Sequence, residues 1–390
     1  MMARIRDRRQ RPRIATHVVV RSVVVMFLAR LGSLNALEQT KDRGFWRQWL
    51  GTPLPSADSL GRILECTEPE TIRQALHELY SQLKRNRALP ATSHGLMALA
   101  IDGHESHATY RRCCAGCLER RVHTRSGWRT QYYHRWVDAL LLSGKFPTWI
   151  DSEPIEPGEE EIAAAKRLLT RALANYPRAF DLVLGDALYT EAGIYALLLD
   201  HGKDALTVLK ANQPELLQEA RTLLEEVEPI VVESPGRWKE LRDLAGFSMA
   251  SELKRPLRVV VSRESRTVRR QLDGQKEESL SEWIWVTTCS SHRATTEAIV
   301  RLGHARWDIE NQGFNEFVNH WYGDHVYKHS AKAMLNFSLL AMLACNLFRA
   351  FYTLQLKAKL HRRWTCLHIA RTLASELYHS ISPAPQARSP

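Results

Sequence analysis

The sequence predicts an α/β fold in which a mixed sheet is flanked by helices, with a β-rich insertion and a helical N-terminal domain. The main observation is a pair of short, nearly continuous apolar runs, 96–101 and 180–186, of the kind found in central strands that are buried on both faces. A second observation is the helical periodicity of residues 14–95, ahead of the first run. The third is a group of β-type segments between residues 212 and 291. A hydrophobic share of 44% excludes disorder as a description of the whole chain.

The N-terminal segment has the pattern of consecutive helices. Val20 and Val24 recur at helical spacing until Gly32 breaks the run, and Ser33 offers an N-cap for the next helix. Further helical periodicity leads to a linker at 90–95. A small helical unit with an Arg-rich arm is a common design for binding nucleic acid. The alternative is a helical packing or dimerisation domain with a solvated arm.

From residue 96 the pattern changes to that of a sheet with crossover helices. The elements come in the order strand, strand, strand, helix, strand, helix and strand, which resembles an RNase H-like core. Three glutamates, 159–161, open the first of these helices, where they complement the helix dipole. We expect the core elements at 96–101, 110–125 (a turn or hairpin), 132–142, 159–176, 180–186, 191–201 and 206–210.

The second half of the chain contains the insertion and then returns to helices. The β-type segments of the insertion are 230–232, 257–261 and 283–288. Helical periodicity continues at 295–302, 306–320 and 331–352, and a Pro/Ser-rich end expected to be disordered lies at 382–390. The predicted organisation is 1–95 (helical DNA-binding region), 96–212 (first part of the core), 213–293 (β-rich insertion), 294–352 (second part of the core) and 353–390 (basic tail).

Two apolar stretches require a choice between a membrane and the protein interior. The stretch 331–348 contains Lys332 and Asn346, among other polar residues, so we expect a buried core helix. Residues 18–28 come after an Arg-rich segment as in a signal peptide, but Arg21 interrupts them and no small-residue cleavage site is present after them. The seven cysteines are an odd number in a long chain, which argues against a disulfide framework. We therefore expect a cytoplasmic, nucleoid-associated protein with no membrane segment.

The charge distribution favours a polyanionic partner, of which nucleic acid is the commonest. The formal net charge is +11. Eight Arg against one Asp give residues 1–30 a local net charge of +7, and seven basic residues against one acidic residue give residues 349–390 a local net charge of +6. Six arginines form an N-terminal arm for which we predict contacts with DNA phosphates: Arg4, Arg6, Arg8, Arg9, Arg11 and Arg13.

Three acidic residues stand where they could share a metal site. Asp102 comes directly after the first apolar run and Asp186 ends the second, at the edge where open α/β sheets bind their ligands. Glu310 lies one helical turn after Arg306, on the same face. Such carboxylates can hold two Mg²⁺ ions about 4 Å apart and drive an in-line attack on a phosphodiester. In the alternative, the aspartates cap strand ends and Glu310 pairs with Arg306 on a surface. Nearby acids that compete for these roles are Glu105, Asp138, Asp181, Asp308 and Glu316.

With these segments in place, residues 50–350 resemble the DDE transposases of bacterial insertion sequences, in particular the group with a β-rich insertion before the catalytic glutamate. The resemblance rests on the motifs Ile101-Asp102-Gly103, Leu184-Gly185-Asp186 and Arg306-x3-Glu310-Asn311, with the apolar helix beyond them. It implies that Asp102, Asp186 and Glu310 are the metal-binding acids. It also implies that Arg306 belongs to the catalytic site.

The family signature around the glutamate is incomplete in this chain. Its form is Tyr-x2-Arg-x3-Glu-x6-Lys, and Gly303 and Phe317 stand at the Tyr and Lys positions. The contacts that those two residues make to the DNA end are therefore absent or supplied elsewhere. Lys328 and Tyr327 are candidate substitutes.

The resemblance also implies an activity and partners. Water would attack at the end of the element to release a 3′-OH, which would then attack target DNA, with Mg²⁺ as cofactor and Mn²⁺ as a substitute. The partners would be double-stranded DNA, as element ends and as target, and further copies of the chain in a homodimer or higher oligomer. One alternative is an RNase H-like endonuclease or resolvase that cuts without joining. Another is a catalytically inactive, DNA-binding remnant.

Further residues are candidates for contacts with DNA. Trp283 and Trp285 alternate in a strand, so both rings point to one face, where one of them could stack on an unpaired base. The alternative is an apolar face of the insertion sheet. Lys210, at the end of a core strand, and Arg135 are candidates for phosphate contacts.

Cys113-Cys114-x2-Cys117 supplies half of a zinc ligand set. A complete site would need two more ligands, and the nearest histidines are His104, His107 and His123. Because the chain has no second C-x2-C motif, packing of the cysteines is the alternative. A separate histidine group includes an i, i+4 pair, but the aromatic residues within it favour a packed or DNA-facing surface: His320, His325 and His329.

Overall fold

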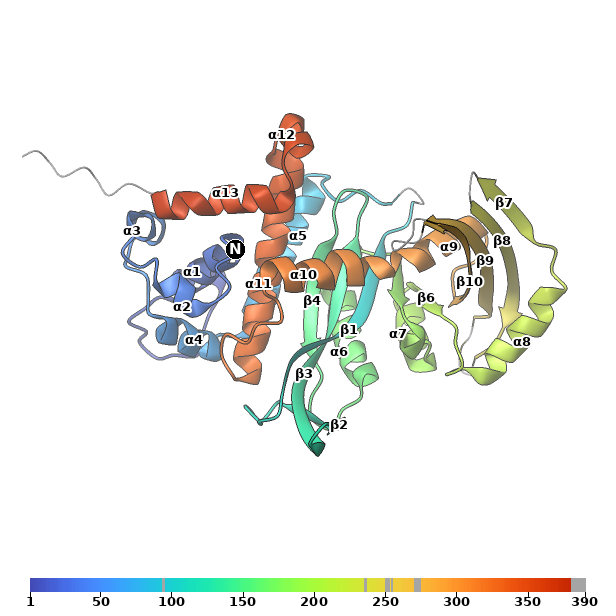
Figure 1. Ribbon diagram of the computed structural model, residues 1–390, viewed down its shortest axis with the longest axis horizontal. Helices are drawn as coiled ribbons and strands as arrows, with labels where there is room; N and C mark the ends of the chain where they lie inside the picture. The colour runs from blue at the N-terminus through green and yellow to red at the C-terminus, as the bar shows by residue number, and fades with distance from the viewer. Residues whose placement is uncertain (93–94, 235–236, 250–252, 254, 270–274, 380–390) are drawn as a thin grey trace, which may run out of the picture. The chain divides into compact units, whose positions relative to one another are not determined.

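The computed structural model describes residues 1–390 apart from 93–94, 235–236, 250–252, 254, 270–274 and 380–390 (Figure 1). The predicted Pro/Ser-rich end, 382–390, lies outside the described residues. The chain divides into two compact units, each built from separate stretches of sequence. The first unit contains Met1–Pro90, Gly103–Asn175 and Asn311–Pro390, and the second contains Ala91–Asp102 and Tyr176–Glu310. The five consecutive segments expected from the sequence stay a prediction.

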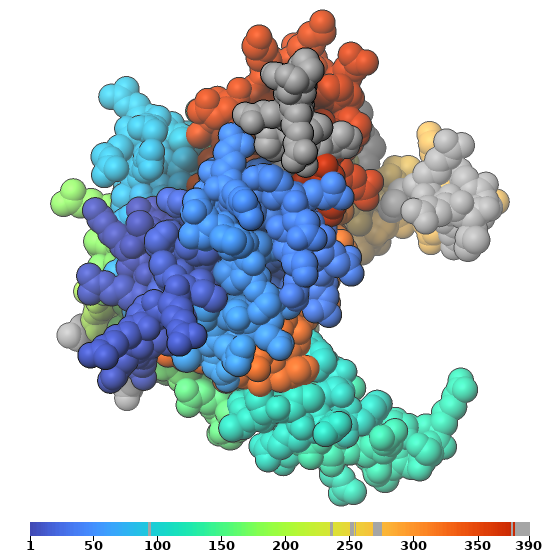
Figure 2. Space-filling model, turned by 90° about the vertical axis from the view of Figure 1, so that its left-hand side faces the viewer, coloured from blue at the N-terminus to red at the C-terminus, as the bar shows by residue number. Residues whose placement is uncertain are grey.

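The N-terminal part of the first unit is helical, as the sequence predicts. Its elements are the 3₁₀ turn Met2–Arg4 and the helices α1 (Thr16–Leu28), α2 (Leu34–Glu38), α3 (Gly44–Leu50), α4 (Ala57–Cys66) and α5 (Pro69–Arg85). The predicted N-cap is confirmed, because the Ser33 hydroxyl accepts the N–H of Ala36 at 3.0 Å. These helices cover much of the face seen in Figure 2.

The long apolar helix α11 (Ala331–Gln355) is the core of the first unit and packs against α1, α4, α5 and β4 (Thr148–Pro154). It is long and apolar enough to cross a membrane, but 78% of its most apolar window is buried inside the protein, so the predicted core helix is confirmed. Its polar side chains bond to buried backbone. The Asn336 amide donates to the carbonyl oxygens of Leu64 and Thr67 at 2.7 and 2.9 Å. Asn346 accepts the N–H of Trp149 at 2.8 Å.

The first unit also holds one part of the sheet. Here the strand order is β2 (Leu118–Thr124), β3 (Gly127–Leu142) and β1 (Ala98–Thr109), and β4 pairs with β3 as well. The first half of β3 forms an antiparallel hairpin with β2, and its second half pairs with β4. Helix α6 (Glu161–Asn175) packs against β3 and β4. The chain ends with the π-helical turn Ile309–Phe314 and the helices α10 (Asn315–Trp321), α11, α12 (Ala358–Arg363) and α13 (Cys366–His379).

The second unit holds the other part of the sheet, in the order β1, β5, β6, β10, β9, β8 and β7. Strands β1, β5 and β6 are parallel, whereas β10 to β7 are antiparallel. Because β10 pairs with β6, the insertion extends the core sheet. The elements are β5 (Leu182–Gly185), the 3₁₀ turn Ala187–Tyr189, α7 (Ala192–Asp200), β6 (Asp204–Val208), α8 (Pro214–Glu225), β7 (Ile230–Ser234), β8 (Arg237–Phe247), β9 (Leu257–Arg269), β10 (Lys276–Thr287) and α9 (Thr296–Ala305).

The predicted order of core elements is confirmed, with four local differences. Strand β1 runs to Thr109 instead of ending before Asp102, because it pairs with β3 after its partner β5 has ended. Strand β8 is not expected from the sequence, because its charged sequence lacks an apolar run, and helix α8, which packs against it (Figure 1), is not among the expected elements. The single helix expected over 306–320 is interrupted by the π-helical turn. Strand β4 has no counterpart among the expected elements.

Candidate active site

The register of two parallel strands places Asp102 beside Asp186. In the β1–β5 ladder, Ala100 is the partner of Leu184, and the two aspartates each lie two residues farther along the chain. Neighbouring strands are about 4.8 Å apart, so the two positions are adjacent. Both residues belong to the second unit. The two apolar runs therefore align the acids at their ends, which is the arrangement that the sequence predicts.

Asp186 is held in place by its own backbone environment. Its Oδ1 atom accepts the N–H of Leu188 at 2.8 Å and thereby caps the short turn Ala187–Tyr189. The side chain is half-buried. In the alternative interpretation of the sequence, Asp186 caps a strand end, and a capping contact is observed. The same contact orients the Asp186 carboxylate beside β1.

Arg306 joins the first and third acids. Its Nη1 atom lies 3.2 Å from Oδ2 of Asp102 and 3.0 Å from Oε1 of Glu310. The Arg306 side chain is only 7% exposed, whereas Glu310 is 37% exposed. The positively charged guanidinium offsets the repulsion between the two carboxylates. The sequence predicts the pairing of Arg306 with Glu310, but it does not predict the contact with Asp102.

The backbone around Glu310 departs from a regular α-helix. Helix α9 ends at Ala305, Arg306 is its C-cap residue, and Glu310 lies in the π-helical turn Ile309–Phe314. Such turns are rare and occur frequently at functional sites. The ion pair with Arg306 bridges the end of α9 and this turn, and so fixes the position of Glu310.

The Arg306 guanidinium lies over the ring of its neighbour Trp307, which in turn contacts the insertion sheet. The Arg306 guanidinium carbon lies 4.4 Å from the centroid of Trp307, and Trp307 meets Trp283 edge-on at 6.3 Å. Trp283 and Trp285 are stacked at 6.2 Å with 12° between their planes, which confirms that both rings point to one face. Trp285 is only 1% exposed, so it is a packing residue rather than a platform for a base. Trp283 is half-buried and remains the candidate for stacking.

Comparison with known proteins decides the family. The profile of the transposase DDE domain matches residues 96–347, nearly two thirds of the chain. The chain belongs to this family. No curated protein matches it. The matched stretch contains Asp102, Asp186, Arg306 and Glu310, and it supports the predicted RNase H-like fold. Membership implies a transposase that acts on DNA and uses a divalent metal ion.

The three acids of this DDE domain, Asp102, Asp186 and Glu310, are of the residue types that bind a divalent metal ion. Two Asp and one Glu offer only carboxylate oxygens, which are the ligands of Mg²⁺ and Mn²⁺. Among the described residues, however, these three carboxylates do not lie within 4.8 Å of one another, whereas the ligand atoms of two His/Cys groups do. The Arg306 guanidinium lies between Asp102 and Glu310 instead.

The packing explains why the DDE domain has Gly303 at the signature Tyr position. A Cβ atom on Gly303 would lie 2.4 Å from the indole of Trp285, so any side chain here would force the indole or the helix to move. The indole of Trp285, on strand β10, thus occupies the space next to α9 that a side chain at position 303 would need. This exchange cannot be recognised in the sequence, since it joins a helix position to a strand position.

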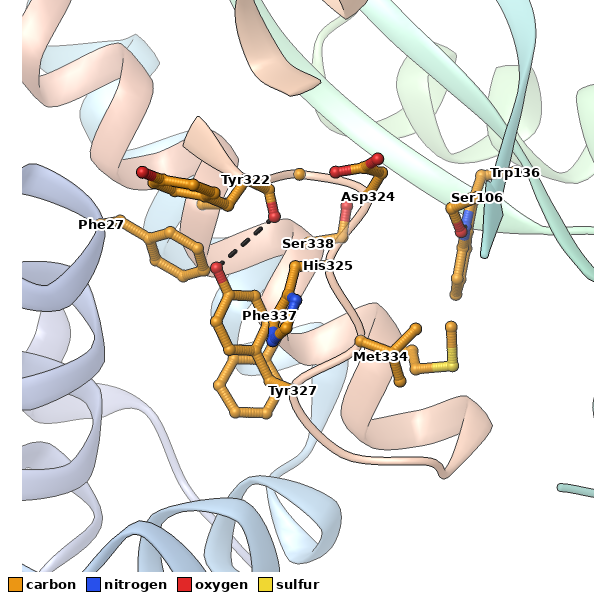
Figure 3. A pocket seen from close by; sticks show the side chains of 13 residues that line it. Phe27, Ser106, Trp136, Tyr322, Asp324, His325, Tyr327, Met334, Phe337 and Ser338 are labelled. Carbon is orange, nitrogen blue, oxygen red and sulfur yellow. Dashed lines mark hydrogen bonds between the residues drawn. The ribbon is translucent and has the colours of Figure 1, made fainter. Parts of the chain in front are cut away.

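The proposed substitutes for the signature residues lie in the first unit. Tyr327 packs beside Phe27 and Phe337, with ring-centroid distances of 5.5 and 4.8 Å (Figure 3). Its hydroxyl donates to the carbonyl oxygen of Tyr322 at 3.5 Å, and burial raises its pKa far above the usual range. Tyr327 therefore packs within the first unit, and its role as a substitute for the signature Tyr stays a prediction. Lys328 is half-buried beside α4. Phe317, at the signature Lys position, is core.

Three of the five competing acids bond to other residues. Glu105 makes two 2.7 Å bonds to Arg120, and the carboxylate of Glu316 lies 2.7 Å from Arg349. Asp181 accepts the N–H of Met97 at 2.8 Å at the opening of its run. Asp138 is buried within β3, and Asp308 comes directly after Trp307. These placements leave Asp102, Asp186 and Glu310 as the best candidates.

The Arg-rich arm is docked on α4 and α5, so it is not the solvated arm of the alternative interpretation. Its Ile5 is buried, and Asp7 forms a β-bridge with Thr67. Three of its six arginines form ion pairs, Arg4 with Glu78, Arg8 with Glu68 and Arg9 with Asp7. Arg6, Arg11 and Arg13 are exposed. Elsewhere, Lys210 is exposed just after β6, while Arg135 pairs with Glu161 at 2.5 Å.

Proposed function

We propose that this DDE-family transposase binds the ends of its own insertion sequence, cleaves DNA there and joins the released 3′-OH to target DNA. The observation that carries the proposal is the assembly of Asp102, Asp186, Glu310 and Arg306 in one unit from separate points of the sequence. The strand register accounts for the first two residues, and one guanidinium joins the first to Glu310. No single motif of the sequence would bring these residues together.

Asp102, Asp186 and Glu310 would hold Mg²⁺, or Mn²⁺ in its place. When bound, the metal supplies activation of the attacking water or 3′-OH and neutralises charge on the leaving oxygen. The protein's own contribution is to position the carboxylates. The N–H of Leu188 that Asp186 accepts orients one of them, and Arg306 holds Asp102 and Glu310 close together.

Arg306 has a further donor for the DNA. Its Nε atom is buried and has no hydrogen-bond partner among the described residues, while Nη1 serves both carboxylates. A buried N–H without a partner is costly, and a phosphate oxygen is the natural acceptor for a guanidinium in this setting. We infer that Arg306 contacts the DNA backbone next to the acids. This would compensate in part for the Lys that Phe317 replaces in the family signature.

Three surfaces would hold the DNA outside the catalytic acids. The exposed arm residues Arg6, Arg11 and Arg13 would contact phosphates, as would Lys210. Trp283 would stack on a base near the cut. The chain would act in the cytoplasm on nucleoid DNA as a homodimer or a higher oligomer.

The experiment that tests this function uses the full-length protein and the DNA that flanks its own gene. Cleavage and joining are scored separately with Mg²⁺, with Mn²⁺ and with Ca²⁺. The proposal expects both cut ends and joined products with Mg²⁺ or Mn²⁺. Cut ends that never join would indicate an endonuclease or resolvase. Binding without any cutting would indicate an inactive remnant.

A further inference from the structure

We propose that Cys114, Cys117 and His134 bind a structural Zn²⁺ ion, and that His107 supplies the fourth ligand. The site lies in the first unit, where the chain enters the β2–β3 hairpin. Its two sulfur atoms are 3.8 Å apart, and the His134 Nε2 atom lies 3.4 Å from Cys114 Sγ and 3.5 Å from Cys117 Sγ. The proposal is independent of the catalytic acids.

These three distances match the edges of a zinc tetrahedron. With Zn–S of about 2.3 Å and Zn–N of about 2.0–2.1 Å, tetrahedral angles separate two sulfurs by about 3.8 Å and a sulfur from a nitrogen by about 3.6 Å. A disulfide would need about 2.05 Å between the sulfurs, and both cysteines are free. The three ligand atoms therefore have the spacing of a metal site and not that of a covalent bond.

The surroundings suit a thiolate-bound ion. Cys117 is 2% exposed and His134 is 5% exposed, so these two ligands are shielded from water, while Cys114 is half-buried. The backbone N–H of Cys114 points to Cys117 Sγ at 3.4 Å, a contact that stabilises negative charge on sulfur. Zinc sites of this kind typically have two cysteines separated by two residues on one turn, and the Cys114–Cys117 pair has this form.

We assign the fourth ligand to the trio of His107, Cys113 and His329, which lies beside His134 because His107 and His329 both act electrostatically on its imidazole. The ligand atoms of these three residues all lie within 4.8 Å of one another. His107 is the first choice, because its Nε2 atom is buried and has no hydrogen-bond partner among the described residues. Its backbone is also left-handed within strand β1, with φ of +51°, a conformation that costs free energy and redirects the side chain.

The ligand set differs from the one expected from the sequence. His104 stacks on Phe314 at 4.7 Å, and His123 meets Trp128 edge-on at 5.3 Å. Their place is taken by His134, which lies 17 residues after Cys117 on strand β3. The hairpin brings His134 back to the cysteines, so the pattern becomes visible only when the pairing of β2 with β3 is known.

The zinc ion would secure the root of the β2–β3 hairpin, which extends beyond the helices in Figure 2. A two-stranded hairpin is marginally stable by itself, so a cross-link at its root has a clear physical benefit. The cysteine turn also lies against the start of α11, since a Cβ on Gly116 would be 2.9 Å from that of Ala331. Exposed arginines are concentrated on and next to the hairpin, which makes it a basic arm: Arg111, Arg112, Arg120, Arg121, Arg125 and Arg129.

The test begins with the metal content of the full-length protein, expressed with added zinc and dialysed against metal-free buffer. We expect about one Zn²⁺ per chain by elemental analysis, since four ligands complete one tetrahedral site, and a loss of nearly all of it in Cys117→Ser and His134→Ala. The matched control is Cys66→Ser, which changes a half-buried cysteine on α4 outside the site and should keep the zinc. A wild-type protein without zinc, or a Cys117→Ser variant that retains it, would overturn the proposal.

A second measurement does not depend on the folding of a variant. Zinc is removed from the wild-type protein with a chelator, and Co²⁺ is titrated in. The proposal expects the intense visible bands of tetrahedral cobalt together with a thiolate-to-cobalt charge-transfer band in the near ultraviolet. Only weak octahedral bands would refute it. His107→Ala should weaken the affinity at least about 10-fold, and Cys113→Ser and His329→Ala should leave it unchanged. A loss in either of the latter variants alone would reassign the fourth ligand.

Discussion

Replacing Arg306 with alanine tests the role of the residue that joins two of the acids. The change removes contacts of 3.2 Å to Asp102 and 3.0 Å to Glu310, from a side chain that is only 7% exposed. Hydrogen bonds to charged groups contribute about 1.5–3 kcal/mol when they are shielded, and exposed ion pairs contribute about 0–1 kcal/mol. Since Glu310 is 37% exposed, we expect the free energy of unfolding to fall by about 1–2 kcal/mol.

The effect on chemistry should be larger than the effect on stability. Loss of one positioned electrostatic donor lowers a rate by about 10²-fold or more, so we expect that reduction in single-turnover cleavage at saturating protein. Arg306→Lys should recover little, because an ammonium group cannot reproduce the planar, multidentate contacts of a guanidinium. Divalent metal should raise the melting temperature of Arg306→Ala more than that of the wild type. In the variant the Arg306 guanidinium no longer lies between Asp102 and Glu310, so a metal ion would be the only cation to stabilise these two carboxylates.

Arg301→Ala is the matched control, since it removes an exposed arginine from the same helix α9. It should leave both the cleavage rate and the metal response unchanged. If Arg306→Ala weakened only DNA binding, and the bound complex still cleaved at the wild-type rate, Arg306 would be an ordinary phosphate anchor and the reasoning would be wrong.

Packing and charge elsewhere in the protein support three further predictions. Arg6→Gln, Arg11→Gln and Arg13→Gln together should lower the log–log salt slope of DNA binding by about 0.9 for each phosphate that the arm no longer neutralises. Deletion of 1–13 should also reduce stability, since it removes the buried Ile5, and an unchanged slope in the triple variant would mean that the arm does not bind DNA. Gly303→Tyr should cost about 1–3 kcal/mol of unfolding free energy in a denaturant titration, because its Cβ would lie 2.4 Å from Trp285, and Trp285→Ala in the same chain should recover part of that cost. Burial raises the pKa of Glu264, but hydrogen bonds from His304, Lys239 and Ser262 outweigh burial and lower it to about 2. The stability that Glu264 contributes is therefore complete above its ordinary value near 4.5 and is lost as the pH falls toward 2. Glu264→Gln should flatten the acid side of the stability curve relative to the wild type, and parallel curves would contradict the assignment.

Local patterns are sufficient to predict the frame of the site. The apolar runs before Asp102 and Asp186 identify two buried strands, and adjacent parallel strands of this kind bring the residues at their carboxyl ends to one edge of the sheet. Arg306 and Glu310 are four residues apart, so their contact requires only helical geometry. In each case the information lies within a few consecutive residues.

Long-range contacts explain the features that the sequence does not reveal. Arg306 and Asp102 are 204 residues apart, and nothing local indicates that one guanidinium serves both acids. Trp285 fills the space beside Gly303 only because β10 and α9 pack together. His134 reaches the cysteines only through the register of the β2–β3 hairpin. Strand β8 is rich in charged residues, and it forms because β9 and β7 pair with it on both sides.

The most direct test of the central claim is single-turnover cleavage of the flanking DNA with Mg²⁺ by three variants, Asp102→Ala, Asp186→Ala and Glu310→Ala. A gel shift on the same DNA measures binding, and Glu105→Ala, which changes a paired acid of the first unit, is the control. Because the acids would share one metal site, each of the three variants should bind DNA nearly as well as the wild type and cut it at background level, while the control cuts normally. Cleavage near the wild-type rate by any one of the three would contradict the proposed site.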